Sequence, residues 1–132
     1  MTVSVLGAGA LGTARAIALP QKTPVQLWAR SEGHVQEMAK AHENAAYLPD
    51  RPFPAVLAVT PEIERAAEAD ILLLAVPMQQ LRAFLKSHGD ALAEKTLVAC
   101  CKGMDLQSGT GPLEVIADEL PKARTALLTG PS

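Results

Sequence analysis

The sequence predicts an α/β fold in which helices cover both faces of a doubly wound parallel sheet. Three observations predict it. Short and almost wholly apolar runs recur along the chain, segments with helical signals separate them, and a glycine-rich loop follows the first run. Continuous apolar runs are typical of parallel strands whose two faces are both buried. We therefore expect residues 1–132 to form one domain of alternating strands and helices.

The apolar runs give the expected strands. The strong ones are residues 3–6, 25–29, 71–76, 97–101 and 125–129, and a weaker one is residues 56–59. Between them the chain has the signals of helices. The first helix is expected to stop at Pro20, because a proline ring clashes with the preceding turn and lacks an N–H. Ser31 has the side chain of an N-cap, and Thr60 followed by Pro61 has the pattern of a cap and a first helical residue. The expected helices are residues 10–19, 33–42, 61–69, 78–91 and 112–120.

Two regions depart from this alternation. Residues 44–54 contain Pro49, Pro52 and Pro54, and we expect them to form an ordered loop that carries Tyr47. The sequence stops directly after the last expected strand, with no helix to cover it. We therefore expect a domain that is truncated at its C-terminus.

Composition excludes several classes of partner. The chain has 12 Lys and Arg against 14 Asp and Glu, a net charge of −2, and no basic run, so we expect no nucleic-acid partner. The longest apolar run, residues 71–76, is far shorter than the roughly 20 residues that span a bilayer. No cationic segment precedes an apolar one at the N-terminus. We expect a cytoplasmic protein with no membrane partner.

The cysteines and histidines indicate packing rather than chemistry. Cys100 and Cys101 are neighbours in an apolar run, which fits core positions in a reducing compartment better than a disulfide. His34, His42 and His88 have no Cys or carboxylate neighbours at the spacing of metal ligands. We expect no metal site.

The glycine loop is the strongest functional signal. Gly7, Gly9 and Gly12 lie between an expected strand and an Ala-rich helix, the context of a dinucleotide-binding loop in a Rossmann-like fold. The first glycine permits a tight turn, the second lets the backbone approach a pyrophosphate, and the third allows close helix–strand packing. The N–H groups that begin the helix then attract the phosphates. The alternative is an ordinary glycine-rich turn.

The end of the second strand bears on the choice of coenzyme. Acidic residues commonly bind the adenosine ribose at this place, but Arg30 stands here. A guanidinium can pair with a 2′-phosphate, so Arg30 favours NADP or dual use of NADP and NAD. Glu32 and Glu37 are possible ribose contacts that keep NAD open. Alternatively, Arg30 is a solvated surface residue.

Other strand ends offer substrate contacts, because ligands of open α/β sheets lie beyond the carboxyl ends of the strands. Pro77 would turn the chain beside the nicotinamide end of a coenzyme. Lys102 and Gly103 follow the fourth strong strand, and an ammonium there could bind the anionic oxygens of a phosphorylated substrate. Gly130 and Ser132 follow the last strand with a backbone N–H and a hydroxyl. A lone lysine is also commonly just a solvated surface residue, so Lys102 is either a substrate contact or a surface residue.

Together these segments resemble a known family. In the chain they are VLGAGALGTA (5–14), LWAR (27–30), ENAAYLP (43–49), AVP (75–77), CKGM (101–104) and GPS (130–132). They occur in the order found in bacterial NAD(P)-dependent glycerol-3-phosphate dehydrogenases, and the resemblance covers essentially the whole chain. The ENAAYLP segment, combined with the Lys-Gly and Gly-Pro-Ser strand ends, is the most specific part.

The resemblance implies a site and a reaction. Its coenzyme contacts would be the glycine loop, the backbone of Ala10 and Leu11, and the residues Arg30, Tyr47 and Lys102. Its contacts to glycerol 3-phosphate would be Lys102, Gly130 and Ser132. The implied reaction is hydride transfer between NAD(P)H and dihydroxyacetone phosphate, which serves glycerophospholipid synthesis. In this family a second, helical domain provides the catalytic lysine. We therefore expect no catalytic residue in this chain, no activity of the chain alone, and a homodimer of the full-length protein.

Two departures from the family and two alternatives remain. Leu11 stands where the family usually has an aromatic residue, and residues 20–24 replace its usual Asn-Gly turn. One alternative is another dehydrogenase of the same architecture, of the ketopantoate reductase or hydroxyacyl dehydrogenase type. The loop around Tyr47 and the pair Lys102-Gly103 argue against it. The other alternative is a non-catalytic module that senses NAD(P).

Overall fold

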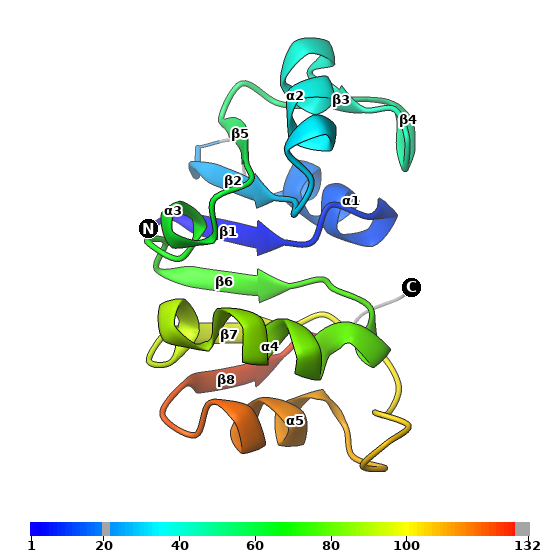
Figure 1. The fold of residues 1–132 in the computed structure, drawn as a ribbon. Helices are drawn as coiled ribbons and strands as arrows, with labels where there is room; N and C mark the ends of the chain where they lie inside the picture. The colour runs from blue at the N-terminus through cyan, green and yellow to red at the C-terminus, as the bar shows by residue number, and fades with distance from the viewer. Residues whose placement is uncertain (20–21, 129–132) are drawn as a thin grey trace.

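The main sheet of the computed structural model has six parallel strands in the order β5-β2-β1-β6-β7-β8 (Figure 1). The structure describes residues 1–19 and 22–128. The strands are β1 (Val3–Leu6), β2 (Val25–Trp28), β5 (Leu57–Thr60), β6 (Ile71–Leu74), β7 (Thr96–Ala99) and β8 (Arg124–Leu127). From β1 the chain first adds strands on one side and then, from β6 onward, on the other. This reversal makes a doubly wound sheet with its switch point between β1 and β6, which confirms the predicted fold class.

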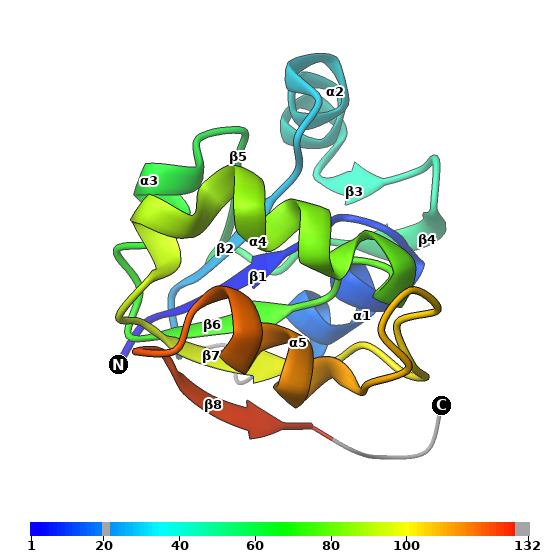
Figure 2. The same ribbon diagram turned by 60° about the horizontal axis from the view of Figure 1, so that its bottom comes forward.

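Helices cover both faces of the sheet, as Figure 2 shows. They are α1 (Ala10–Ala18), α2 (Glu32–Ala41), α3 (Ile63–Ala66), α4 (Met78–Leu92) and α5 (Pro112–Glu119). One core packs α3, α4 and α5 against strand residues such as Leu6 and Leu72, which are fully buried. The other core packs α1 and α2 against the opposite side chains, such as Val5 and Leu27. Adjacent strand residues therefore serve different cores, which explains why the runs are apolar throughout.

The strand predictions are confirmed, with small shifts at the ends. The run 71–76 forms a strand only to Leu74, and the run 97–101 only to Ala99. Beyond these points single ladder bonds continue, since the Cys100 N–H still donates to Leu74 O at 2.9 Å. The prediction for residue 129 falls outside the described residues. The strands are shorter than predicted because the residues after them keep apolar, buried side chains without continuing the regular ladder.

The helix predictions are confirmed except for the length of α3. Ser31 caps α2 as predicted, because its hydroxyl accepts a hydrogen bond from the His34 N–H at 3.2 Å. The first helix ends at Ala18, and Pro20 lies outside the described residues. Thr60 Oγ1 accepts from the Glu62 N–H, but α3 spans only Ile63–Ala66, much less than the predicted 61–69. The extended backbone of Glu62 delays the start of this helix.

The predicted loop at residues 44–54 is wrong in one respect, because it contains a small antiparallel hairpin. Strand β3 (Glu43–Asn44) pairs with β4 (Leu48–Pro52) through an irregular register. Strand β4 is largely exposed, and Asp50 has a positive φ of 63°. Its prolines and its lack of an apolar alternation hide it from pattern analysis.

The cysteines lie in the core, as predicted. Cys100 is 2% exposed and Cys101 is 6% exposed. Burial raises the pKa of Cys100, and burial raises the pKa of Cys101 to about 11. Across residues 1–19 and 22–128, no three His, Cys, Asp or Glu side chains gather in a way that could hold a metal ion. No helix in the part of the chain that the structure describes is long and apolar enough to cross a membrane.

Candidate functional site

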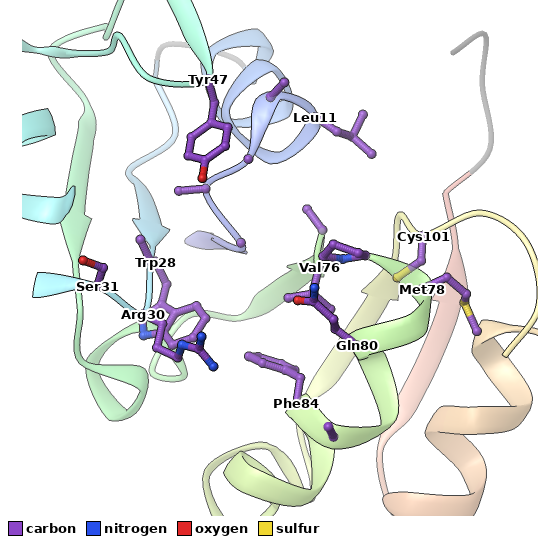
Figure 3. Close-up of a pocket in the computed structure, with 18 of the residues that line it drawn as sticks. Leu11, Trp28, Arg30, Ser31, Tyr47, Val76, Met78, Gln80, Phe84 and Cys101 are labelled. Carbon is purple, nitrogen blue, oxygen red and sulfur yellow. The ribbon is translucent and has the colours of Figure 1, made fainter. Parts of the chain in front are cut away.

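A cleft of about 1000 Å³ runs along the carboxyl ends of β2, β1 and β6. Its wall consists of the glycine loop, the residues that follow β2 and β6, one side of α4, and the pair Cys101-Lys102 (Figure 3). The cleft therefore lies at the topological switch point, where open α/β sheets bind their ligands. Its volume is at the upper end of the range for small-molecule and cofactor sites.

The structure gives Gly7 and Gly12 the backbone roles that their spacing predicts. Gly7 has φ +117°, and a Cβ there would lie 3.0 Å from the Ala75 carbonyl carbon. A Cβ at Gly12 would lie 1.9 Å from Gly7 O, so only a hydrogen fits between α1 and the loop. At Gly9, by contrast, a Cβ would meet no described atom within 4 Å. Gly9 therefore leaves open space where the loop faces the cleft.

The start of α1 faces this open space. Gly9 is the N-cap, and Ala10 and Leu11, the first two helical residues, line the cleft. The N–H groups of a first helical turn have no partner within the helix, and the helix dipole adds a partial positive charge. The first turn of α1 contains no acidic residue that would neutralise this charge. The geometry suits a phosphate group.

The β2 end of the cleft combines a cation with aromatic rings. Arg30 is exposed, and Figure 3 shows it projecting toward Phe84 of α4. The Trp28 ring lies edge-on to the Phe84 ring, with centroids 5.5 Å apart, and also contacts His88. Burial, and then the positive charge of Arg30, lower the pKa of His88, while Glu64 raises it. This end of the cleft can take a flat, partly apolar group beside a guanidinium.

The two acidic residues that could contact the adenosine ribose do not line the β2 end of the cleft. Glu32 and Glu37 lie exposed on α2, and neither is among the described residues that line the cleft. The β2 end of the cleft therefore offers Arg30 and Ser31, but no carboxylate from α2.

The β3–β4 hairpin borders the cleft beside the glycine loop, where it contributes Tyr47 to the lining. Tyr47 is 57% exposed, and its ring lies 5.4 Å from the His34 ring, which also lines the cleft. Beneath them Asn44 is fully buried. Its side chain bonds to Ala8 of the glycine loop, to Thr13 of α1 and to His34 of α2. Sequence analysis missed Asn44 and His34, although Asn44 belongs to the ENAAYLP segment and is the only asparagine in the chain.

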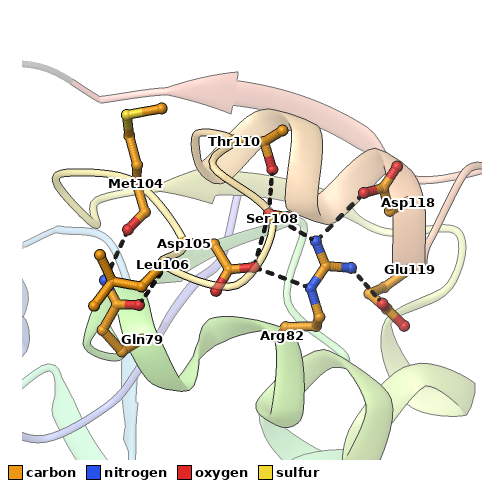
Figure 4. A network of polar contacts seen from close by, with 9 residues as sticks. All are labelled: Gln79, Arg82, Met104, Asp105, Leu106, Ser108, Thr110, Asp118 and Glu119. Carbon is orange, nitrogen blue, oxygen red and sulfur yellow. Dashed lines mark hydrogen bonds and ion pairs between the residues drawn. The ribbon is translucent and has the colours of Figure 1, made fainter.

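Lys102 lies at the other end of the cleft, after β7, with an exposed side chain. Gly103 follows with φ +93°, a conformation that favours glycine. The next residues are fastened to α4 (Figure 4). Gln79 donates to Met104 O at 2.7 Å and accepts from the Leu106 N–H at 3.0 Å. The backbone next to Lys102 is therefore held in place.

Arg82 strengthens this attachment. It contacts Asp105 at 3.3 Å, Asp118 at 3.3 Å and Glu119 at 2.7 Å, and so joins α4 to α5 and to the loop (Figure 4). Hydrogen bonds from Ser108 and Arg82 lower the pKa of the buried Asp105 carboxyl. The Glu119 carboxylate is the main cause that raises the pKa of Arg82. No local sequence signal indicates this cluster, because its members lie far apart along the chain.

The structure brings most of the expected site residues to one cleft. Its lining includes Gly7, Gly9, Ala10, Leu11, Arg30, Tyr47 and Lys102. Gly12 lies behind the loop, where it sets the packing of α1. The expected substrate contacts Gly130 and Ser132 lie outside the described residues.

Comparisons with known proteins agree with this geometry. Residues 2–132 match the family described as NAD-dependent glycerol-3-phosphate dehydrogenase N-terminus. The whole chain is 54% identical to part of a glycerol-3-phosphate dehydrogenase (NAD(P)+) of Ruegeria sp. (strain TM1040), and 48% identical to part of the protein so named in Roseobacter denitrificans. In both cases it spans 41% of the relative's length.

A solved structure leads to the same assignment. The crystal structure of a glycerol-3-phosphate dehydrogenase from Coxiella burnetii superposes with a TM-score of 0.89 at 31% identity. The match covers 99% of this chain and 41% of that protein. These similarities do not favour the other dehydrogenase types. The chain belongs to the family of N-terminal domains of NAD-dependent glycerol-3-phosphate dehydrogenases.

Proposed function

We propose that residues 1–132 form the coenzyme-binding domain of a glycerol-3-phosphate dehydrogenase and bind NADP or NAD in the cleft. The observation that supports this most directly is the glycine loop. It opens into the cleft beside the unpaired N–H groups of α1, with Arg30 at one end and Lys102 at the other. A Cβ at Gly7 or Gly12 would force the neighbouring backbone to shift, and Gly9 leaves open space in which a ligand can approach the backbone of the loop. The residues present therefore fit a dinucleotide.

Each part of the cleft then has one task. The N–H groups around Ala10 and Leu11 bind the pyrophosphate, and Tyr47 covers it from the hairpin. Arg30 binds the adenosine end, where it pairs with a 2′-phosphate when one is present. This arrangement favours NADP over NAD. Lys102 and the turn at Pro77 face the nicotinamide end.

The substrate in this proposal is dihydroxyacetone phosphate or glycerol 3-phosphate. When bound, the coenzyme supplies or accepts the hydride exchanged with the substrate carbon. Lys102 contributes a cation beside the substrate oxygens, and Gly130 and Ser132 contribute polar contacts. The chain spans 41% of its curated relatives, and we propose that the catalytic lysine of the full-length protein lies outside residues 1–132. Residues 1–132 alone then bind coenzyme without turnover. The cytoplasmic location and the homodimer remain predictions for the full-length protein.

Binding can be measured through Trp28, the only tryptophan, which lines the cleft at the adenosine end. Titration of the chain with NADPH should quench its fluorescence to saturation, and NADH should do so less tightly. Full-length protein should oxidise NADPH when dihydroxyacetone phosphate is added. A chain that binds neither nucleotide at millimolar concentration contradicts the proposed coenzyme site. A full-length protein that binds NADPH but does not react with this substrate contradicts the proposed reaction only.

A further inference from the structure

The buried side chain of Asn44 connects the glycine loop to the hairpin and to α2. We propose that Asn44 is a positioning residue, which holds the peptide between Ala8 and Gly9 in the orientation that lets the loop bind a pyrophosphate. This inference rests on the proposed coenzyme site and adds a residue that does not itself line the cleft. Three features support it: the hydrogen bonds of the Asn44 side chain, the conformational freedom of the glycines beside Ala8, and the contact between Asn44 and Tyr47 in the hairpin.

The contacts of Asn44 use its whole amide. Its Nδ2 donates to Ala8 O at 2.8 Å and to Thr13 Oγ1 at 2.8 Å. Its Oδ1 accepts from Nε2 of His34 at 2.9 Å. A carbonyl oxygen can only accept, so the group facing Ala8 must be the amide nitrogen. These bonds fix the orientation of the amide, and the side chain is fully buried, so water cannot replace its partners.

The bond to Ala8 O determines the direction of the next N–H. The peptide between Ala8 and Gly9 is planar and trans, so its C=O and N–H groups point in opposite directions. When Asn44 holds the oxygen on its own side, the Gly9 N–H must point away from the Asn44 amide. Ala8 has a glycine on either side, Gly7 and Gly9, and glycines adopt many backbone conformations. Backbone bonds hold the neighbouring Gly7 N–H on Trp28 O and Gly9 O on Thr13 N–H, and the bond from the buried Asn44 side chain restricts the Ala8 carbonyl itself before the ligand arrives.

Asn44 also helps to position Tyr47, the hairpin residue that lies over the cleft. The Tyr47 N–H donates to Asn44 O at 3.3 Å, and the Tyr47 ring packs on His34, the partner of Asn44 Oδ1. Glycine loop, α1, α2 and hairpin thus meet at one amide. Loss of the amide donor should leave the hairpin attached through its backbone, while the loop peptide becomes free to reorient.

The test compares two ligands in the same variants. Asn44→Asp keeps the shape but puts an acceptor against Ala8 O, and Asn44→Ser removes the reach of the side chain without adding charge. Each should weaken NADPH binding by about tenfold or more, the usual effect of losing a buried hydrogen bond. Binding of 2′-AMP, which has the adenosine end but no pyrophosphate, should change less than twofold. Gln36→Glu, an exposed amide-to-carboxylate change on α2 outside the cleft, is the matched control and should bind both ligands like the wild type.

Each outcome has a distinct meaning. Variants that bind NADPH like the wild type, or that lose both ligands equally, contradict the positioning role. A wild-type chain that does not bind NADPH contradicts the proposed function instead. If neither variant folds, the side-chain amide of the single asparagine can be followed by NMR in the wild type. Its protons should exchange slowly and shift with NADPH but not with 2′-AMP, and fast exchange or no such difference overturns the inference.

Discussion

Replacement of Gly12 by alanine tests whether close packing of α1 on the loop is a structural requirement. The added Cβ would lie 1.9 Å from Gly7 O and 3.1 Å from Ala75 Cβ. Carbon and oxygen atoms in contact lie more than 3 Å apart, so the loop or the helix must move by more than an ångström. Because the required shift is so large, the cost of this overpacking lies at the upper end of the usual range, about 3 kcal/mol, and alanine regains about 1 kcal/mol in helix propensity. We expect the free energy of unfolding to fall by about 2 kcal/mol, with a fall in Tm of roughly 5–10 °C.

Two other glycines provide matched comparisons in the same assay, thermal unfolding followed by circular dichroism. Gly33→Ala on α2 brings its nearest contact, Ser31 Oγ, to an ordinary 3.8 Å, so its Tm should stay the same or rise slightly. Gly9→Ala meets no described atom within 4 Å and should leave Tm unchanged but weaken NADPH binding, because the methyl group enters the open space at the loop. If Gly12→Ala unfolds at the wild-type temperature, the argument from packing is refuted. If Gly9→Ala binds NADPH like the wild type, that space is not where the ligand lies.

Three further predictions concern charge and burial. Arg30→Asp should weaken NADPH binding by about a hundredfold, as expected for removal of a charge-assisted contact and introduction of repulsion, and NADH binding by less than threefold; equal losses in the two titrations would disprove the role of Arg30 at the 2′-phosphate. Arg82→Met should lower the free energy of unfolding at pH 7. The bonds from Ser108 and Arg82 lower the pKa of Asp105 in the folded state. The Asp105 part of the difference from wild type should therefore be complete above the ordinary carboxyl pKa and be lost as pH falls from there through the lowered pKa, and a pH-independent difference in urea titrations would argue against this pairing. Cys100 and Cys101 should not react with a thiol reagent at pH 8 until denaturant unfolds the chain, and fast labelling of the native protein would contradict their burial.

The parts of the structure that sequence predicts are those set by short-range physics. The strand from Val3 to Leu6, the turn at Gly7 and the start of α1 lie within about a dozen residues, and each depends on local backbone geometry. The same is true of the Ser31 cap. The hairpin is different, because its strand Leu48–Pro52 is mostly exposed and contains two prolines. Its position depends on the bond from its own residue Asn44 to the distant Ala8, which no local pattern reveals.

The candidate site divides in the same way. Residues after strand ends can be inferred from topology alone, which explains why Arg30 and Lys102 are predicted as ligand contacts. The residues that hold these segments could not, since Asn44 meets Ala8 across 36 positions and Arg82 meets Glu119 across 37. Such contacts exist only after the sheet has assembled.

Exposure separates the groups that can touch a ligand from the groups that hold them. Tyr47 is exposed over the cleft, whereas the Asn44 beneath it is fully buried. Lys102 is likewise exposed, whereas the Asp105 that fastens its loop through Arg82 is 5% exposed. Both places therefore combine an exposed side chain on a loop with a buried polar group that fixes the loop to a helix. Because a buried polar group must keep all its partners, substitution should be less tolerated at Asn44 and Asp105 than at the exposed positions that they support.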